Sequence, residues 1–512
     1  MPKEKIIRDS IHGYIKLTEL ESEIIQLPVF NRLHRIRQSS FAFMVYPTAQ
    51  GTRFAHSVGT MKVASDIAEE ILKNLSYDDK KSILGDMKVH EKEREFVEIA
   101  RLAGLLHDIG HGPFSHTSER ILAEALKQES PNEYDEGCRL WGRVDFPVHE
   151  FYTYKLIKEG QDLAELLEKK GPPNCKQIIC DVITHRSRSS NISQEALNLL
   201  QQIITSQLDA DKMDYLLRDA YTSGVGYGQI DIQRIILSMR IKKTNSGYRL
   251  AILERGLSAV EDMVDARFKM YKWLYHHHMV VLMDVLLEKA IEALVKEKIL
   301  EPQELHWKTF DKGLTDDATI TYLLSKEILC NRKQSFQAFL GLLDRRFAPV
   351  SLIKRPEDFE KICKDISKDI SSRLGIIYDY GELKKEVENV VRSTTFEKDL
   401  EDELRDRSST NAALQEVEVL VGFRPRPPYS PISRDPILIV TETEDEKLIE
   451  ITALSQYIKN INAAWEAFPT LYVGYVLPGR KKYDIKDLKQ IIREALIASI
   501  VKSIAKLAQS RP

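Results

Sequence analysis

The sequence predicts a mainly α-helical protein with a small α+β lobe at its C-terminal end, and three observations carry this prediction. Apolar residues recur at steps of three and four in long stretches such as residues 96–106, which is the period of one helix face. Strand candidates are few and short, at residues 249–253, 437–441 and 471–476. Prolines gather in residues 424–436, where neither a helix nor a central strand continues.

The same periodicity locates the main helices. They are expected at residues 58–71, 96–106, 195–220, 256–298 and 484–508. A chain of 512 residues is typical of two or three domains. We expect a core of residues 1–300, a helical extension of residues 301–430 that offers an oligomer interface, and a small α+β lobe of residues 431–512. Strands are expected only near the end of the core and in this lobe.

Composition excludes several classes of protein. Hydrophobic residues make up 43% and charged residues 29%, with a net charge of −3, so the chain is an ordinary globular protein and nucleic-acid binding is not favoured. No apolar run of about 18 residues occurs, and the first residues contain no signal-peptide core, so we expect a cytoplasmic protein without membrane contact. Five scattered cysteines predict free thiols: Cys138, Cys175, Cys180, Cys330 and Cys363.

The segment LLHDIGHGPFSH, residues 105–116, is the richest in groups that could do chemistry. His107 follows Phe96 by eleven residues, so it lies on the buried face of the predicted helix, and Asp108 is adjacent. A histidine and a carboxylate directed into a helical core need a partner. A divalent metal is one such partner; a hydrogen bond between the two side chains is the other, and the pair alone leaves both open.

Two further segments carry similar groups. RFAH, residues 53–56, begins a helix with a cation and an imidazole. In LDADKMDYLLRDAY, residues 208–221, five polar residues share one helix side. They are Asp211, Asp214, Tyr215, Arg218 and Asp219. A solvated surface face explains this pattern as well as a functional site does.

These motifs resemble a known family. The ordered set His56, His107–Asp108 and Asp211 matches the H…HD…D signature of HD-domain phosphohydrolases. The surrounding segments DSIHGYIKL, FNRLHRIRQ and RFAHSVGT, together with Tyr275 and His277, resemble deoxynucleoside triphosphate (dNTP) triphosphohydrolases. The resemblance covers residues 5–290 strongly, and the tail after about residue 430 more weakly. It implies an HD-domain helical bundle as the core.

The resemblance implies a metal centre. His56, His107, Asp108 and Asp211 would ligate one transition metal, which is iron, manganese or zinc, and leave positions open for water and a phosphate oxygen. Such an ion stabilises charge at the α-phosphorus and lowers the pKa of bound water. Mg²⁺ or Mn²⁺ would accompany the substrate phosphates.

The resemblance also implies catalytic roles for a group of imidazoles and carboxylates. His116 would be the general acid that protonates the leaving 5′-oxygen. His111 and His149 would be the other imidazoles of the pocket. Glu119 or Glu150 would orient them, and Glu119 stands where an aspartate is usual.

Seven side chains are implied in substrate binding. Arg53, Lys212 and Arg267 would clamp the triphosphate, which carries about four negative charges. The resemblance assigns the nucleoside to Gln38 and Asp219, which would bond the 3′-hydroxyl, to Tyr215, which would exclude a 2′-hydroxyl, and to Tyr275, which would flank the base or sugar.

One early segment departs from the family pattern, and one glycine-rich segment has an explanation other than phosphate binding. Gln26 and His34 occupy positions where an acid and an arginine of the animal enzyme help to bind an activating guanine nucleotide, although Asn31 and Arg32 keep the flanking pattern. The resemblance then implies regulation by another nucleotide or by none. The glycines of residues 222–228 are interpreted as the turn that ends a helix and not as a phosphate cradle.

The consecutive histidines at positions 276–278 would point about 100° apart on a helix and cannot converge on one ion. We therefore interpret this run as incidental, apart from His277.

The leading hypothesis is a metal-dependent hydrolase that splits a dNTP into deoxynucleoside and inorganic triphosphate. The alternative keeps the metal site and changes the substrate to an oligonucleotide or another phosphoester, as in HD-type nucleases and phosphodiesterases. A third hypothesis is a nucleotide-sensing module without turnover. By analogy we expect a homo-oligomer, either a dimer, a tetramer or a hexamer.

Overall fold

The chain forms two compact units, each assembled from separate stretches of sequence. The computed structural model describes residues 5–85, 88–186, 192–245, 247–329, 349–393, 395–408, 413–414, 417–423, 436–442, 447–466, 471–476 and 485–510. The first unit comprises Met1–Tyr271, Glu297–Tyr322 and Pro428–Ala463. The second unit comprises Lys272–Lys296, Leu323–Pro427 and Ala464–Pro512. These two units are defined by contacts and have other boundaries than residues 300 and 430, so they do not test the expected division into three domains, which stays a prediction.

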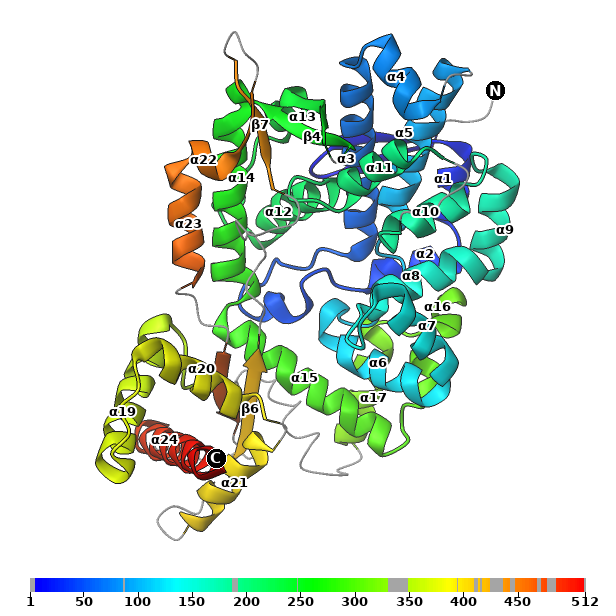
Figure 1. Ribbon diagram of the computed structural model, residues 1–512. Helices are drawn as coiled ribbons and strands as arrows, with labels where there is room; N and C mark the ends of the chain where they lie inside the picture. Colours follow the sequence, from blue (N-terminus) through cyan, green and yellow to red (C-terminus); the bar gives the residue numbers. More distant parts are fainter. Residues whose placement is uncertain are drawn as a thin grey trace. The chain divides into compact units, whose positions relative to one another are not determined.

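Four helices form the centre of the first unit (Figure 1). The long helices α3 (Arg53–Lys73) and α5 (Val89–Leu106) pack along each other, α12 (Ala210–Ser223) packs on α3, and α11 (Gln194–Ile204) packs on α5. Their facing side chains are buried and apolar, as the periodicity predicts. The mainly α class is therefore confirmed.

Further helices surround these four. They are α1 (Glu19–Ile24), α2 (Pro28–Asn31), α4 (Tyr77–Leu84), α6 (Glu119–Glu129), α7 (Pro131–Trp141), α8 (Val148–Glu159), α9 (Gln161–Lys170), α10 (Cys175–Ile183), α13 (Ile232–Ser238), α14 (Leu257–Met270), α16 (Trp307–Asp311), α22 (Ile451–Leu454) and α23 (Gln456–Glu466). Helix α17 (Asp317–Leu329) begins in the first unit and ends in the second, and the last residues of α23 also belong to the second unit.

Polar caps set the ends of the helices that carry the site. The Thr52 side chain accepts a hydrogen bond from the Ala55 N–H at the start of α3, and Asp209 accepts one from the Lys212 N–H at the start of α12. Helix α12 ends at Gly224, whose φ of 75° is in the left-handed region that glycine tolerates. The glycine-rich segment therefore ends the helix, as predicted.

The first unit also holds two small sheets. A hairpin pairs β1 (Lys5–Asp9) with β2 (Gly13–Leu17). The second sheet has the order β3-β4-β7-β8, in which β4 and β7 are parallel and the other pairs antiparallel. These strands are β3 (Met239–Thr244), β4 (Gly247–Leu253), β7 (Leu438–Val440) and β8 (Leu448–Glu450).

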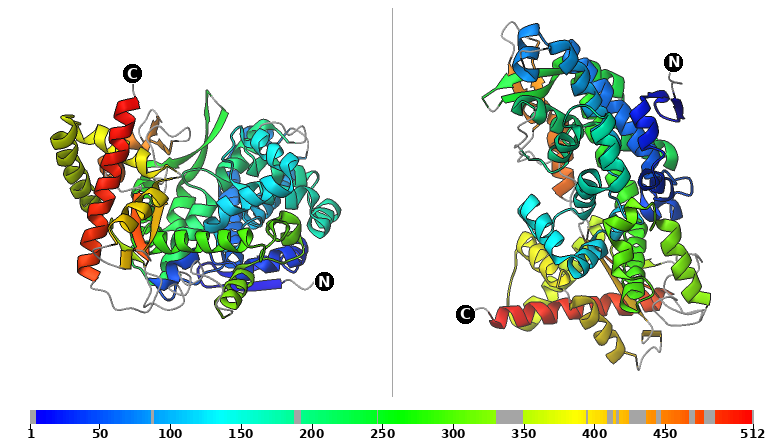
Figure 2. Two further views of the ribbon diagram at one scale, coloured as in Figure 1. Left: turned by 90° about the horizontal axis from the view of Figure 1, so that it is seen from below. Right: turned by 90° about the vertical axis from the view of Figure 1, so that its right-hand side faces the viewer.

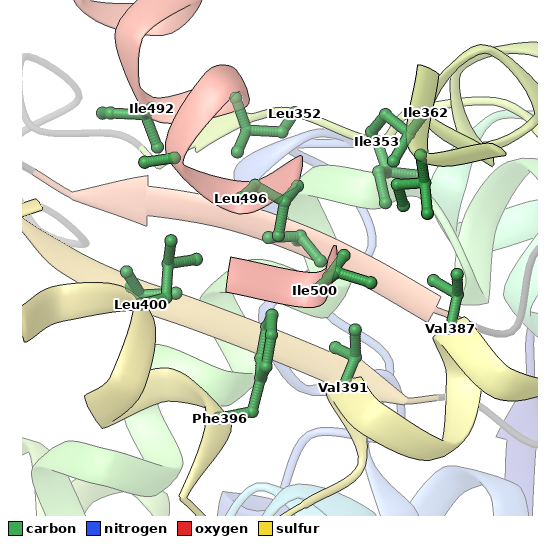
Figure 3. Close-up of a cluster of buried hydrophobic side chains, with 14 of the residues drawn as sticks. Leu352, Ile353, Ile362, Val387, Val391, Phe396, Leu400, Ile492, Leu496 and Ile500 are labelled. Atoms are coloured by element: carbon green, nitrogen blue, oxygen red, sulfur yellow. The ribbon is translucent and has the colours of Figure 1, made fainter. Parts of the chain in front are cut away.

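The second unit is built around a three-stranded sheet and a long helix, seen in red in Figure 2. The sheet order is β5-β9-β6. Its elements are β5 (Val350–Ser351), β6 (Glu418–Phe423), β9 (Leu471–Val476), α15 (His278–Lys296), α19 (Pro356–Leu374), α20 (Tyr380–Val391), α21 (Phe396–Asp406) and α24 (Ile485–Ser510). Leu496 and Ile500 of α24 pack against Val391, Phe396 and Leu400 in one apolar cluster (Figure 3).

Several sequence expectations are corrected. The 195–220 stretch is interrupted between α11 and α12, and 256–298 is broken by a π-helical segment, Tyr271–Tyr275. Strands were expected only from residue 249 onward, near the end of the core and in the C-terminal lobe, yet β1 and β2 lie at the start of the chain. The predicted strands at 249–253, 437–441 and 471–476 all exist within a residue or two of their expected bounds. The proline-rich segment lies outside the described residues, apart from Pro436.

Cys138, Cys175, Cys180 and Cys363 are free thiols, as predicted. Cys330 lies outside the described residues. Of the helices in the described part of the chain, none combines the length and the apolar character that crossing a bilayer requires.

The α3–α5 contact predicts the effect of a single methyl group. A Cβ added at Gly104 of α5 would lie 3.0 Å from the Met61 Cα and the Thr60 carbonyl oxygen of α3, so Gly104→Ala forces the backbones apart. We expect a loss of about 1–3 kcal/mol of stability. At Gly226 an added Cβ meets nothing within 4 Å, so Gly226→Ala is the matched control. Equal thermal midpoints for the two variants would contradict this packing.

Candidate metal centre and histidine pocket

Three helices bring two histidines and two aspartates together. His56 is in the first turn of α3, His107 and Asp108 directly follow α5, and Asp211 is in the first turn of α12. The His56 Nε2 atom lies 3.0 Å from the Asp211 Oδ1 atom and 3.4 Å from the Asp108 Oδ2 atom. The His107 Nε2 atom lies 3.6 Å and 3.4 Å from the same two oxygens. All four predicted ligands therefore converge.

The two Nε2 atoms are better suited to binding a metal than to hydrogen bonding with the surrounding side chains. Both are buried, and neither has a hydrogen-bond partner of good geometry among the described residues. His56, His107 and Asp108 each present a ligand atom within 4.8 Å of the others. Two imidazole nitrogens and two carboxylate oxygens suit iron, manganese or zinc. A direct His107–Asp108 hydrogen bond, the alternative left open by the sequence, is not formed at 3.4 Å with this geometry.

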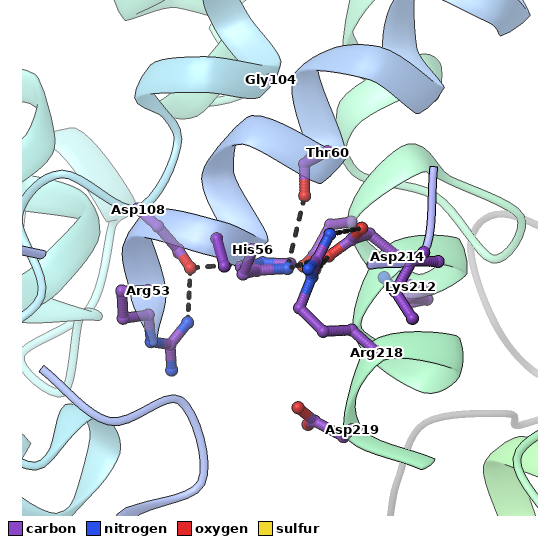
Figure 4. A network of polar contacts seen from close by, with 12 residues as sticks. Arg53, His56, Thr60, Gly104, Asp108, Lys212, Asp214, Arg218 and Asp219 are labelled. Carbon is purple, nitrogen blue, oxygen red and sulfur yellow. Dashed lines mark hydrogen bonds and ion pairs between the residues drawn. The ribbon is translucent and has the colours of Figure 1, made fainter. Parts of the chain in front are cut away.

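The opposite nitrogen of each imidazole is held by a fixed acceptor. The His107 Nδ1 atom lies 2.8 Å from the Gly104 carbonyl oxygen, and the His56 Nδ1 atom lies 2.8 Å from the Asp214 Oδ2 atom. Such outer contacts fix the tautomer and leave Nε2 for a metal. Figure 4 shows the His56 ring between Asp108 on one side and Asp214 with Arg218 on the other.

Asp214 is the residue that the sequence reasoning did not assign. It is fully buried and accepts hydrogen bonds from the His12 Nε2 atom at 2.6 Å and from two Arg218 nitrogens at 2.8 and 2.9 Å. Arg218 in turn donates to the Asp9 carboxylate at 2.8 Å. The signal was present, because Asp214 is three residues after Asp211 in the polar stripe of α12. Its burial excludes the solvated-face interpretation of that stripe.

Charge compensation keeps this buried centre stable. Burial alone lowers the pKa of His56, but the negative charges of the Asp211 and Asp214 carboxylates beside its two ring nitrogens raise this pKa to about 10, so the ring holds a proton that a bound metal would displace. Burial raises the pKa of Asp108, yet the Arg53 guanidinium, which pairs with that carboxylate, holds it well below its usual range. Asp108 is therefore an anion at neutral pH, as a metal ligand must be.

A second group of side chains lies next to the first: His111, His116, Glu119 and His149. The His111 Nε2 atom is 3.3 Å from the Asp108 Oδ1 atom, which connects the two groups. The His111 and His149 rings stack 4.1 Å apart with planes only 10° from parallel. Because imidazole lone pairs lie in the ring plane, two parallel stacked rings cannot both point at one ion. These residues fit proton transfer better than they fit a second metal.

The two stacked rings hold different charges. Burial lowers the pKa of His149, but the Glu119 carboxylate, 2.7 Å from the His149 Nδ1 atom, raises it to about 9. Burial and the nearby Arg53 cation hold the pKa of His111 well below its usual range. His149 is therefore protonated at neutral pH and His111 is neutral. Glu150 instead accepts a hydrogen bond from the Trp141 Nε1 atom at 3.0 Å, so its catalytic role stays a prediction.

His116 is the accessible imidazole of the group. Its side chain is 68% exposed, and its Nδ1 atom lies 3.6 Å from the Glu119 Oε2 atom. Its ring meets the His111 and His149 rings edge-on, at 4.7 and 5.2 Å between centroids. A ligand at this site can therefore reach the His116 ring from solvent.

The expected phosphate cations are already paired. Arg53 pairs with Asp108, the Lys212 Nζ atom lies 2.5 Å from the Asp209 Oδ2 atom, and Arg267 donates to the Gln207 Oε1 atom at 3.2 Å. These contacts orient the three cations, and Arg53 also donates through Nε to the Ser115 hydroxyl at 2.9 Å.

The residues expected to bind the nucleoside are divided between the units. Asp219 accepts a hydrogen bond from the Ser39 hydroxyl at 3.2 Å, and the Gln38 Oε1 atom is buried without a hydrogen-bond partner among the described residues. The Tyr215 ring lies 6.5 Å from the His56 ring. Tyr275 ends the π-helical segment and belongs to the second unit, so its role stays a prediction.

Fold and site define a class: a helical bundle with a buried histidine–aspartate centre, which is the architecture of HD domains. The comparisons agree with this. Residues 53–219 match the HD domain family, and residues 230–331 match the HD associated region. The chain therefore contains an HD domain followed by an HD associated region.

Similar proteins come from several kingdoms. An uncharacterized protein of Methanocaldococcus jannaschii is 31% identical over 69% of this chain and 62% of its own length. The deoxynucleoside triphosphate triphosphohydrolase SAMHD1 of Homo sapiens is 26% identical over 56% of this chain and 44% of its own. The chain thus spans less than two thirds of these relatives.

One solved structure has the same fold along almost all of the chain. A hypothetical protein of Aquifex aeolicus, 24% identical, covers 96% of this chain and 100% of its own with a TM-score of 0.61.

The orientation of His56 predicts a metal-binding defect. Asp214→Asn removes the anion that holds the His56 Nδ1 atom, so metal affinity falls by about 10- to 100-fold. Bound metal, measured by elemental analysis against a chelator series, reports this loss. Asp66→Asn is the control, because Asp66 is a carboxylate on α3, the helix of His56, and pairs with Lys62 instead of His56. Equal metal retention in the two variants would contradict the orienting role.

The His149–Glu119 pair predicts a pH effect. Since the folded-state pKa of His149 is raised to about 9, the pair stabilises the fold fully below pH 6.5 and loses this contribution as the pH rises through 9. In Glu119→Gln the His149 pKa drops and this part of the pH dependence disappears. Histidine NMR titration measures the pKa directly. An unchanged His149 titration in Glu119→Gln would exclude the pair as its cause.

Proposed function

We propose that this protein is a dNTP triphosphohydrolase, which releases deoxynucleoside and inorganic triphosphate. The convergence of two buried imidazole nitrogens with two carboxylates, next to a second group that contains an accessible histidine, carries the proposal. His56, His107, Asp108 and Asp211 would hold a metal ion, which would supply positive charge at the α-phosphate and lower the pKa of a water molecule. The names of the SAMHD1 relatives support the substrate class.

The chain's own residues divide the remaining work. Arg53 and Lys212 have fixed guanidinium and ammonium groups that attract the triphosphate. His116 is exposed and donates a proton to the leaving 5′-oxygen. His149, protonated at neutral pH beside Glu119, keeps positive charge next to His116. Gln38 and Asp219 bond the 3′-hydroxyl, and Tyr215 covers the sugar. Homo-oligomer assembly and regulation by an allosteric nucleotide belong to the same proposal.

The product distribution tests this function. The protein is incubated with each dNTP, the matching ribonucleotides and a single-stranded oligonucleotide in Mn²⁺ or Mg²⁺, and the products are separated by anion exchange. We expect inorganic triphosphate and deoxynucleoside from the dNTPs only. Pyrophosphate would show attack at another phosphorus, and mononucleotides from the oligonucleotide would favour the nuclease alternative.

The general acid is tested by substitution. His116→Gln lowers kcat by about 10²- to 10⁴-fold, because the leaving oxygen then departs without a proton from this side chain. Metal content stays at the wild-type level, since His116 is not among the converging ligands. His90→Gln is the matched control: His90 is exposed on α5 and pairs with Glu93. Full activity in His116→Gln would remove this residue from the mechanism.

A further inference from the structure

A strained turn connects the His111 and His116 segments. Phe114 and Ser115 both have a φ of 56°, in the left-handed region that favours glycine, and neither is a glycine. Phe114 is buried and its ring stacks on Phe41 at 5.3 Å. Two consecutive non-glycine residues in this conformation persist only where neighbouring groups hold them.

Ser115 connects this turn to the metal centre. The Ser115 hydroxyl accepts a hydrogen bond from the Arg53 Nε atom at 2.9 Å and donates one to the Arg37 carbonyl oxygen at 2.6 Å. Arg53 pairs with the ligand Asp108. The position of the turn therefore fixes both His116, the next residue, and the Arg53 guanidinium.

A carboxylate from beyond the HD domain holds the turn. Asp317, at the start of α17, accepts the Phe114 backbone N–H at 2.6 Å through Oδ1 and the Arg37 backbone N–H at 3.0 Å through Oδ2. Asp317 is 5% exposed, and burial raises the pKa of its carboxyl to about 6. At pH 7 the carboxylate is thus ionised despite its burial, and the two backbone N–H groups stabilise its charge.

Arg32 holds the other end of the same loop. Its guanidinium is fully buried over the Phe310 ring and donates to the carbonyl oxygens of Thr315, at 3.2 Å, Ile109, at 3.1 Å, and His111, at 2.7 Å. Residues 310–317 therefore contact the loop of residues 109–116 at two points. Asp317 binds the Phe114 N–H directly, and Thr315 is connected to Ile109 and His111 through Arg32. All of these residues lie in the first unit.

We propose that Asp317 is a positioning residue: its carboxylate maintains the left-handed Phe114–Ser115 turn and so places His116 and Arg53 for the reaction. This gives the HD-associated region a part in the HD-domain site. The inference rests on the proposed function for its effect on turnover, but its structural content is measurable without any substrate.

The experiment compares Asp317→Asn with Asp316→Asn. Asparagine keeps the size of Asp317 but offers only one oxygen for two N–H groups, and its own NH₂ faces the other. Asp316 is the adjacent buried carboxylate, which binds Arg35 and the Thr319 N–H instead of the turn. We expect kcat in Asp317→Asn to fall on the order of 10- to 100-fold. KM and bound metal stay near wild type, and Asp316→Asn keeps its kcat.

Hydrogen exchange, followed by mass spectrometry on the peptide that contains residues 112–116, is measured in parallel. We expect faster exchange there in Asp317→Asn only, because the Phe114 N–H loses its acceptor. Equal kcat and equal exchange in Asp317→Asn and Asp316→Asn would overturn the inference, whether both match wild type or both are impaired. If the wild type releases no triphosphate from any dNTP, the proposed function is wrong. The hydrogen-exchange result then decides by itself whether Asp317 positions the turn. If Asp317→Asn does not fold, Asp317→Glu, which keeps the charge, replaces it in the same comparison.

Discussion

The close approach of α12 to α3 at Gly59 is the constraint on which the candidate centre depends. A Cβ at Gly59 would lie 1.9 Å from the Asp214 Oδ1 atom and 2.3 Å from an Arg218 nitrogen, so only glycine lets α12 come this near. At this distance Asp214 reaches His56. Because α12 also carries Asp211, the same contact brings the fourth converging side chain to the two Nε2 atoms.

The buried charges around the candidate centre are tolerated because each one forms an ion pair with a neighbouring residue of opposite charge. Asp214 is matched by Arg218, and Arg218 by Asp9, while Asp108 is matched by Arg53. Unpaired, any one of these groups would cost several kcal/mol in the apolar interior. The charges therefore hold the helices in one arrangement, and the Nε2 atoms are left as the unsatisfied groups that a cation completes.

The two histidine groups differ in geometry more than in composition. Around His56 and His107 the rings are nearly perpendicular, at 77°, and their nitrogens face common oxygens. Around His111 and His149 the rings are stacked, and a carboxylate is bonded to one of them. Convergent nitrogens suit an ion, whereas stacked rings of unequal pKa suit the holding and passing of protons. One loop, residues 109–116, joins the two groups and depends on contacts from residues 310–317.

The sequence by itself determined the helical class and the strands at 249–253, 437–441 and 471–476, since periodicity encodes them. The four converging side chains were indicated by the resemblance to the H…HD…D signature, because their spacing alone left a hydrogen-bonded pair and a solvated helix face open. The sequence could not show that Asp214 orients His56, that Glu119 and not Glu150 bonds His149, or that Asp317 reaches the Phe114 N–H. It also placed too few strands, and it missed the hairpin of β1 and β2, whose strands are only five residues long. The three side-chain contacts of Asp214, Glu119 and Asp317 join residues from 30 to about 200 positions apart. Only the packing of the helices decides such distances, because a hydrogen bond depends on tenths of an ångström in space and leaves no periodic trace along the chain.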